Sequence, residues 1–325
     1  MRAFRVIVRR LVAALPTLLL VSLGAFLLLE SAPGDAADAY LAQTGGDAGY
    51  AASLRERFGL EGTTPDRLLR FYAGLAQGDL GTSAVFGRPV ASVIVERLPT
   101  TLLLMTCAVG FAALVGTGLG LVAGAKPGSL RDHAITAATL GLLAMPNFWL
   151  ALLLVLLFGV RLAWLPTSGL SDPGSPATGL AAILDTARHL VLPTLALGAG
   201  YLALYARTLR AGMAASWRTD PVRAARARGL PEHRVIWRAV ARPALLPVVV
   251  LLGQQAGTLF GGSVVVETVF GIPGLGRLAY EAVAGRDTLL LVGVVLTGTM
   301  VVIAANLAVD LVLVRLDPRI GAADA

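Results

Sequence analysis

The segment TTLLLMTCAVGFAALVGTGLGLVA, residues 100–123, decides the class of fold because none of its 24 residues is charged. An α-helix needs about 20 apolar residues to cross the hydrocarbon core of a bilayer. The sequence therefore predicts an all-α integral membrane protein with six transmembrane helices. The other five predominantly apolar runs are Leu11–Leu29, Ile135–Val160, Leu190–Leu209, Leu245–Val266 and Thr288–Val314.

The overall composition supports this class. Hydrophobic residues make up 56% of the 325 residues and charged residues 14%, whereas a soluble domain has about 45–50% and 25%. The first apolar run has a second interpretation, because four arginines precede it and the sequence ADA follows at 37–39, as in a secretory signal. Leu11–Leu29 is longer than the roughly 7–15 apolar residues of such a signal, so we favour a transmembrane helix.

The charges predict the orientation of the chain in the membrane. Of the 27 lysines and arginines, 17 lie on one side of the six expected helices and 10 on the other. The richer side carries both termini and the loop of residues 210–243, and loops rich in basic residues stay in the cytoplasm. The net charge of +7 then follows from topology, and we expect no nucleic-acid partner.

The predicted organisation has four parts. They are residues 1–30 (N-terminal tail and first transmembrane helix), 31–98 (an external, periplasmic loop region), 99–314 (the transmembrane core, including the cytoplasmic loop 210–243) and 315–325 (a cytoplasmic tail).

Two of the external loops differ in character. The region of residues 31–98 is longer than a connection requires. Helical spacing of apolar residues in YAASLRERFGL (50–60) and PDRLLRFYAGLAQ (65–77) predicts a small external structure with helices. The loop Arg161–Arg188 is rich in Pro, Gly and Ser, which predicts an irregular surface segment.

No pattern for covalent chemistry is visible. The chain has no GxxxxGK[ST] phosphate loop, and its only lysine is Lys126, so any energy from ATP needs a partner. His133, His189 and His233 are far apart in the sequence, and no HExxH, GxSxG or paired-carboxylate motif occurs. We expect no catalytic residue, metal site or cofactor on this chain. A single cysteine, Cys107, cannot form an internal disulfide.

The segment DPVRAARARGL, residues 220–230, is the strongest candidate for an interaction site. Asp220 followed by Pro221 predicts a helix start, with the Asp side chain accepting amide hydrogens, and Gly229 predicts its end. Small residues between them leave one face without bulk, so another protein can approach closely. The alternative is a solvated arginine loop at anionic lipid. The candidate docking residues are Asp220, Arg223, Ala224, Ala225, Arg226, Ala227, Gly229 and Leu230.

Polar residues inside the apolar runs are candidates for a translocation path or gate. Such groups either join helices or line an aqueous path, and the sequence leaves the two roles equally open. For Pro146 and Asn147 in MPNFW we favour a structural kink. The candidates are Asn147, Gln254, Gln255, Thr258, Ser263 and, at the outer end of its run, Glu267.

RAARARG at 223–229 resembles the EAA loop of the permease subunits of ABC importers, although Arg223 stands where that motif has Glu. Over nearly its full length the chain resembles the first permease subunit of dipeptide, oligopeptide and nickel importers. The matching pieces are APGD (32–35), GDLGTS (78–83), MPNFW (145–149), HLVLPTLALG (189–198), ARGL (227–230), VVETVFGIPGLGRL (265–278) and DPRI (317–320).

The resemblance implies a type I importer fold in the bacterial plasma membrane. It also implies a homologous second permease subunit, two cytoplasmic ATPases that hold ATP and Mg²⁺ and dock on residues 220–229, an external binding protein that delivers cargo, and surrounding lipid. Peptides, nickel chelates, opines and sugars are all possible cargo. The alternative function is a stand-alone secondary transporter or channel, against which the scarcity of acids at mid-membrane speaks. A membrane-embedded enzyme lacks the clustered groups it needs.

Overall fold

A computed structural model of the protein describes residues 2–31, 34–35, 37–38, 41, 53, 55–56, 61–172, 174 and 178–316. Within this part of the chain the regular secondary structure is helical, and the only β-type pairing is an isolated bridge between Thr82 and Pro89. The fold class expected from the sequence is thereby confirmed as all-α. The predicted helical segment 50–60 lies mostly outside the described residues.

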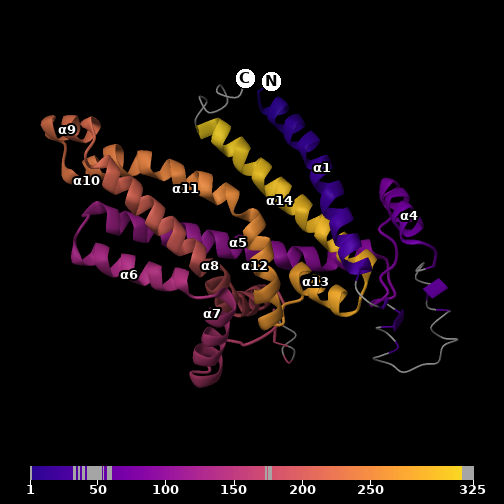
Figure 1. The fold of residues 1–325 in the computed structure, drawn as a ribbon. Helices are drawn as coiled ribbons and strands as arrows, with labels where there is room; N and C mark the ends of the chain where they lie inside the picture. Colours follow the sequence, from indigo (N-terminus) through magenta and orange to yellow (C-terminus); the bar gives the residue numbers. More distant parts are fainter. Residues whose placement is uncertain are drawn as a thin grey trace. The chain divides into compact units, whose positions relative to one another are not determined.

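The chain divides into two compact units, which we describe separately. The first comprises Met1–Leu102 and Ile272–Leu307, and the second Leu103–Gly271 and Ala308–Ala325. Figure 1 labels the helices in both. Two long helices, α5 (Val90–Ala125) and α14 (Thr288–Leu316), contribute residues to both units.

The first unit packs α4 (Thr64–Ala76) against α1 (Arg2–Glu30) and α14 through a small apolar core. Phe26 of α1 and Phe71 of α4 are buried, with ring centroids 6.3 Å apart. At the start of α4, Thr63 and Asp66 form a reciprocal capping box, which satisfies two amide groups at the helix start. The helix expected at 65–77 is therefore confirmed. The remaining helix of this unit is α13 (Leu275–Ala284).

The second unit is built around α8 (Leu180–Ser216), whose central residues are buried. Glycines of α5 allow the two helices to touch: a Cβ on Gly116 would lie 2.6 Å from the Leu202 carbonyl oxygen, and one on Gly120 2.7 Å from that of Ala206. Small residues at four-residue spacing commonly join helices in membranes. The other elements of this unit are α6 (Leu130–Ala144), α7 (Asn147–Leu154), η1 (Val155–Arg161), α9 (Asp220–Ala227), α10 (Glu232–Val235), η2 (Ile236–Ala241), α11 (Arg242–Gln254) and α12 (Ala256–Val269).

Two expected single helices are broken. The run Ile135–Val160 becomes α6 and α7, which meet at an angle of 103° (Figure 1). Pro146 lies at the break, where it cannot donate a backbone hydrogen bond and clashes with the preceding turn. The expected kink is confirmed and is a full change of direction. The run Leu245–Val266 is interrupted at Gln255, between α11 and α12.

The apolar helices are fewer than the six expected when judged by length and composition. Four continuous helices can cross a membrane, and the bent pair α6 and α7 with η1 makes a fifth. In α1 the apolar stretch Val12–Leu28 is shorter than this criterion requires. Six crossings remain a prediction. The expectation that 161–188 is irregular throughout is wrong, because α8 already begins at Leu180.

Candidate coupling surface and translocation path

The short helix α9 begins and ends close to the expected positions. Its N-cap is Thr219, one residue earlier than expected, and the Asp220 carboxylate is 3.3 Å from the guanidinium of Arg223 instead of capping the helix. At the other end Gly229 has φ +72°. The Gly229 amide donates to the Arg226 carbonyl oxygen, and the Leu230 amide to that of Ala225. This pair of bonds is a Schellman motif, in which glycine is favoured.

The two faces of α9 have different environments. Val222 and Ala225 are buried in the core of the second unit, and Leu230 packs partly against the same core. Ala225, expected on the docking face, is 3% exposed and faces the chain's own interior. The opposite face and the end of the helix carry exposed residues: Arg223, Ala224, Arg226, Ala227, Arg228 and Gly229.

Three polar contacts fix α9 to the rest of the second unit. Trp217 Nε1 donates to the carbonyl oxygen of Gly124, near the end of α5, at 2.9 Å. The guanidinium of Arg226 lies 5.0 Å from the Trp217 ring centroid and 2.7 Å from the Glu232 carboxylate. The hydrogen bond with Glu232 raises the pKa of Arg226. These contacts connect α9, through Trp217 and Glu232, to the end of α5 and to the start of α10.

An ion pair between the buried Asp132 and the partly exposed Arg210 joins α6 and α8 in the same region, and no sequence pattern indicates it. Arg210 Nε and Nη2 donate to the two oxygens of Asp132 at 2.8 Å each. The Asp132 side chain is 1% exposed and also accepts from the backbone amide of Gly128 at 2.8 Å. Bidentate arginine–carboxylate pairs are strong and directional. The partners are 78 residues apart, so no local pattern reveals the pair.

Candidate path residues on α7 and α12 lie close to residues of α8 in the second unit. Asn147, at the start of α7, lies between two glycines: a Cβ on Gly200 of α8 would be 3.9 Å from its Oδ1, and one on Gly262 of α12 3.7 Å from its Nδ2. One turn from Gly262, the Thr258 hydroxyl donates to the backbone carbonyl oxygen of Gln255 at 3.0 Å and lies near the Tyr201 hydroxyl. The structure therefore brings Asn147 and Thr258 together with Tyr201, which the sequence analysis did not name.

Two buried polar atoms beside this group lack a hydrogen-bond partner among the described residues: the Tyr205 hydroxyl and Gln255 Oε1. The helices α8 and α12 run antiparallel, with Leu197 of α8 next to Gly262 of α12 and Tyr201 next to Thr258. The Tyr205 hydroxyl and Gln255 Oε1 therefore lie at a similar height along the two helices. One further turn along each helix leads to Tyr205 and to Gln254–Gln255. Unpaired buried polar groups are costly and are often found at functional sites.

The other three candidates have different surroundings. Gln254 is exposed. Ser263 is fully buried, and its hydroxyl donates to the Phe260 carbonyl oxygen of its own helix at 2.8 Å. Glu267 is 0% exposed, so it does not present an open polar surface at the end of α12. In the described part of the chain, no three His, Cys, Asp or Glu side chains gather as metal ligands.

The fold and this site define a class: a polytopic helical membrane protein that carries a short helix with one face anchored in the core and one basic face exposed. Residues 116–322 match the family of inner membrane components of binding-protein-dependent transport systems. The chain belongs to this family. The resemblance first inferred from short motifs is thereby confirmed, and the protein is a membrane component of a transport system that depends on a binding protein.

Similar proteins cover nearly the whole chain. The di/tripeptide transport system permease protein DppB of Pseudomonas aeruginosa is 36% identical, over 97% of this chain and 98% of its own length. The oligopeptide transport system permease protein AppB of Bacillus subtilis is 34% identical, over 97% and 98%. The glutathione transport system permease protein GsiC of Pectobacterium atrosepticum is 37% identical, over 96% and 97%.

Proposed function

We propose that this chain is the permease subunit of an ATP-driven importer that carries peptides across the bacterial inner membrane. The observation that carries the proposal is the helix α9, whose small and basic face is exposed while its other face is anchored in the core. The cargo follows from the relatives, which are permeases for di- and tripeptides, oligopeptides and glutathione. A nickel chelate or an opine is the alternative cargo.

The proposed complex contains a second, homologous permease subunit, two cytoplasmic ATPases and an external binding protein. The ATPases hold ATP and Mg²⁺, and this chain performs no covalent chemistry. Both termini and α9 lie in the cytoplasm, in agreement with the excess of basic residues there. Each ATPase receives one permease's α9 in a groove on its surface.

In the proposed mechanism, ATP binding closes the ATPase pair and moves α9. Trp217 and its bond to Gly124 pass the movement to α5, and the buried pair Asp132–Arg210 makes α6 and α8 move together. The permeases then open outward to receive cargo from the binding protein, and hydrolysis returns them to the inward-open state. A cycle of this kind requires each ligand to favour a different conformation.

Cargo contacts in the proposed path come from the polar group on α7, α8 and α12. Asn147, Tyr205, Gln255 and Thr258 offer both hydrogen-bond donors and acceptors. A peptide presents the same two kinds of group along its backbone. The unpaired Tyr205 hydroxyl and Gln255 Oε1 can bond passing cargo without first breaking a bond within the protein.

Reconstitution of the complete transporter in vesicles tests the proposal. With the binding protein outside and ATP available to the ATPases, we expect uptake of a labelled dipeptide that stops when ATP is replaced by a non-hydrolysable analogue. Uptake by this chain without ATPase subunits would instead identify a secondary transporter. ATP-dependent uptake of a nickel chelate but of no peptide would retain the mechanism and change the cargo.

A further inference from the structure

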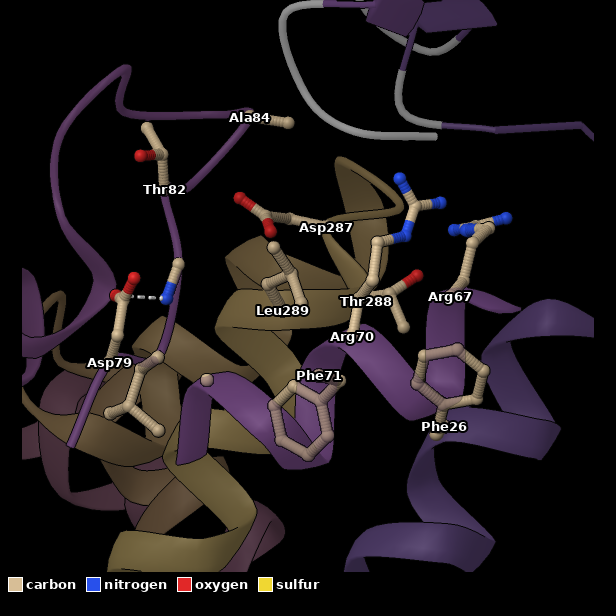
Figure 2. A pocket seen from close by; sticks show the side chains of 13 residues that line it. Phe26, Arg67, Arg70, Phe71, Asp79, Thr82, Ala84, Asp287, Thr288 and Leu289 are labelled. Atoms are coloured by element: carbon tan, nitrogen blue, oxygen red, sulfur yellow. Dashed lines mark hydrogen bonds between the residues drawn. The ribbon is translucent and has the colours of Figure 1, made fainter. Parts of the chain in front are cut away.

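The first unit contains a cavity of about 190 Å³ that the permease function described above does not use (Figure 2). Most of the cavity wall comes from α4, the end of α1 and residues 79–84, all of which precede the segment 116–322 matched by the family. The rest of the wall is the start of α14, residues 287–289. By the expected topology this region faces the outside of the cell.

Both signs of charge occur in the cavity, on different sides. Figure 2 shows the guanidinium groups of Arg67 and Arg70 on one side and the Asp79 carboxylate on the other, with the rings of Phe26 and Phe71 below. A cavity with separated charges and an apolar floor suits a ligand group that is itself partly charged and partly apolar.

The cavity wall opposite Arg67 and Arg70, formed by residues 78–85 and Asp287, has a backbone conformation fixed by glycines and hydrogen bonds. Gly78 and Gly81 have φ of +79° and +78°, and a Cβ on Gly81 would lie 2.8 Å from Leu289. The Asp287 carboxylate, 1% exposed, accepts hydrogen bonds from the Ser83 hydroxyl at 2.5 Å and the Val85 amide at 3.0 Å. The cavity is therefore preformed by contacts within the protein.

The charged groups in the cavity differ in how far they are already paired. Arg67 is 2.7 Å from Glu30 and 14% exposed, so its charge is largely used within the protein. Asp287 also accepts from the Leu290 amide at 3.0 Å. Arg70 is exposed, donates to the backbone carbonyl oxygen of Glu61 and interacts electrostatically with the Asp66 carboxylate, without a hydrogen bond between the two side chains among the described residues. Its other guanidinium N–H groups can therefore bind an anion. Asp79 is exposed and accepts from the Gly81 amide through one oxygen.

We propose that this cavity binds the carboxylate end of a peptide, with Arg70 holding the terminal carboxylate and Asp79 accepting from the N–H groups of the ligand. The inference rests on the proposed peptide cargo. Every di-, tri- or oligopeptide with an unmodified end carries one such carboxylate, whatever its side chains. Arginine binds a carboxylate through two parallel hydrogen bonds, so it recognises this common feature.

The size of the cavity fixes how much of the peptide enters. Sites for whole small molecules occupy about 300–1,000 Å³, which is more than this cavity offers. One terminal residue is held, with its side chain against Phe26 and Phe71, and the rest of the peptide stays outside. The site therefore captures the end of a peptide near the membrane surface and leaves sequence selection to other parts of the transporter.

Direct binding to the purified complete transporter, without binding protein, tests this site. The probes are alanyl-alanine and its C-terminal amide, and saturation-transfer NMR measures their affinities. We expect Arg70→Gln to weaken binding of the free peptide about tenfold or more, the loss expected for a hydrogen bond to a charged group. The amide binds weakly to the wild type and is unaffected by the substitution. Arg70→Lys, which keeps the charge, restores part of the affinity.

Arg88→Gln is the matched control, because Arg88 belongs to the same expected external region, pairs with Glu96 and does not line the cavity. It leaves the affinity of both probes unchanged. Equal affinity of Arg70→Gln and the wild type for the free peptide, or equal affinity of the wild type for peptide and amide, overturns the proposal.

A second measurement distinguishes a peptide from an acidic side chain of the binding protein. The concentration of binding protein that half-activates ATP hydrolysis is compared between the wild type and Arg70→Gln. A shift in this concentration with unchanged peptide affinity assigns the cavity to docking and overturns our inference. If wild-type vesicles import no peptide at all, the proposed cargo fails; if they import peptide and Arg70→Gln changes nothing, only the cavity assignment fails.

Discussion

The region around α9 and the group of polar residues on α7, α8 and α12 differ in how their polar atoms are paired. Near α9, Trp217, Arg226, Asp132 and Arg210 all have partners at 2.7–2.9 Å. In the other region, the Tyr205 hydroxyl and Gln255 Oε1 are buried and have no hydrogen-bond partner in the part of the chain that the structure describes. Paired groups hold helices rigidly, whereas unpaired groups keep bonding capacity for something that arrives later. The difference agrees with the proposed roles of the two regions, transmission of movement near α9 and contact with cargo at α7, α8 and α12.

The largest expected effect comes from Asp132→Ala, which removes one partner of the buried ion pair. Arg210 is then left without its carboxylate between α6 and α8, and breaking such a pair costs about 3–5 kcal/mol when both groups are buried. Because the Arg210 side chain is 37% exposed, we expect about 3 kcal/mol. Thermal unfolding of the purified transporter measures the loss. Glu96→Ala breaks the exposed pair with Arg88 and serves as the control, with an unchanged midpoint. Equal midpoints for both variants would show that the Asp132–Arg210 pair does not hold α6 and α8 together.

A smaller effect is expected at the end of α9. Gly229→Leu forces a branched residue into the left-handed conformation, which costs roughly 1–2 kcal/mol, and moves Leu230 out of its contact with the core. We expect peptide uptake to fall about tenfold or more at normal membrane abundance, while ATP hydrolysis continues. Gly229→Asn tolerates the same backbone conformation and should retain more uptake than Leu. Full coupling in both variants would mean that the docking surface lies elsewhere.

The smallest expected effect comes from Tyr205→Phe, in the group of polar residues on α7, α8 and α12. Tyr205→Phe removes a buried hydroxyl that has no partner, so the transporter becomes more stable by about 1 kcal/mol. If that hydroxyl bonds cargo, uptake falls several-fold in the same variant, because stability and function oppose each other at such a site. Ser263→Ala is the control, since its hydroxyl is already paired within α12. Lower stability of Tyr205→Phe would show that the hydroxyl is paired after all.

Parts of the coupling region could be predicted because their causes are local. Asp220–Pro221 and Gly229 delimit α9 within one residue, since helix starts and left-handed ends depend on adjacent residues. The helix α4 follows from apolar spacing in the same way. Ala225 was misassigned to the docking face, because a helix eight residues long does not reveal which of its small residues meets the core.

The environments of the candidate path residues could not be predicted from the sequence. Gln255 and Ser263 look equivalent in the sequence, as polar residues in one apolar run. In the structure Ser263 bonds its own helix, whereas Gln255 lies at the break between α11 and α12, and its side-chain Oε1 has no partner among the described residues. Which polar group finds a partner depends on the neighbouring helices, and neither apolar spacing nor composition contains that information.

By itself, the sequence determined that this protein lives in a membrane, that α9 is a short basic helix ended by glycine, and which family the chain resembles. Apolar length, capping residues and ordered motifs are properties of neighbouring residues. Only the tertiary structure decided that Asp132 meets Arg210, that the buried Tyr205 hydroxyl and Gln255 Oε1 lack a partner among the described residues, and that Arg70, Asp79 and Asp287 line one cavity. These features join residues far apart in the chain, and packing among helices selects them from many pairings that the sequence alone allows.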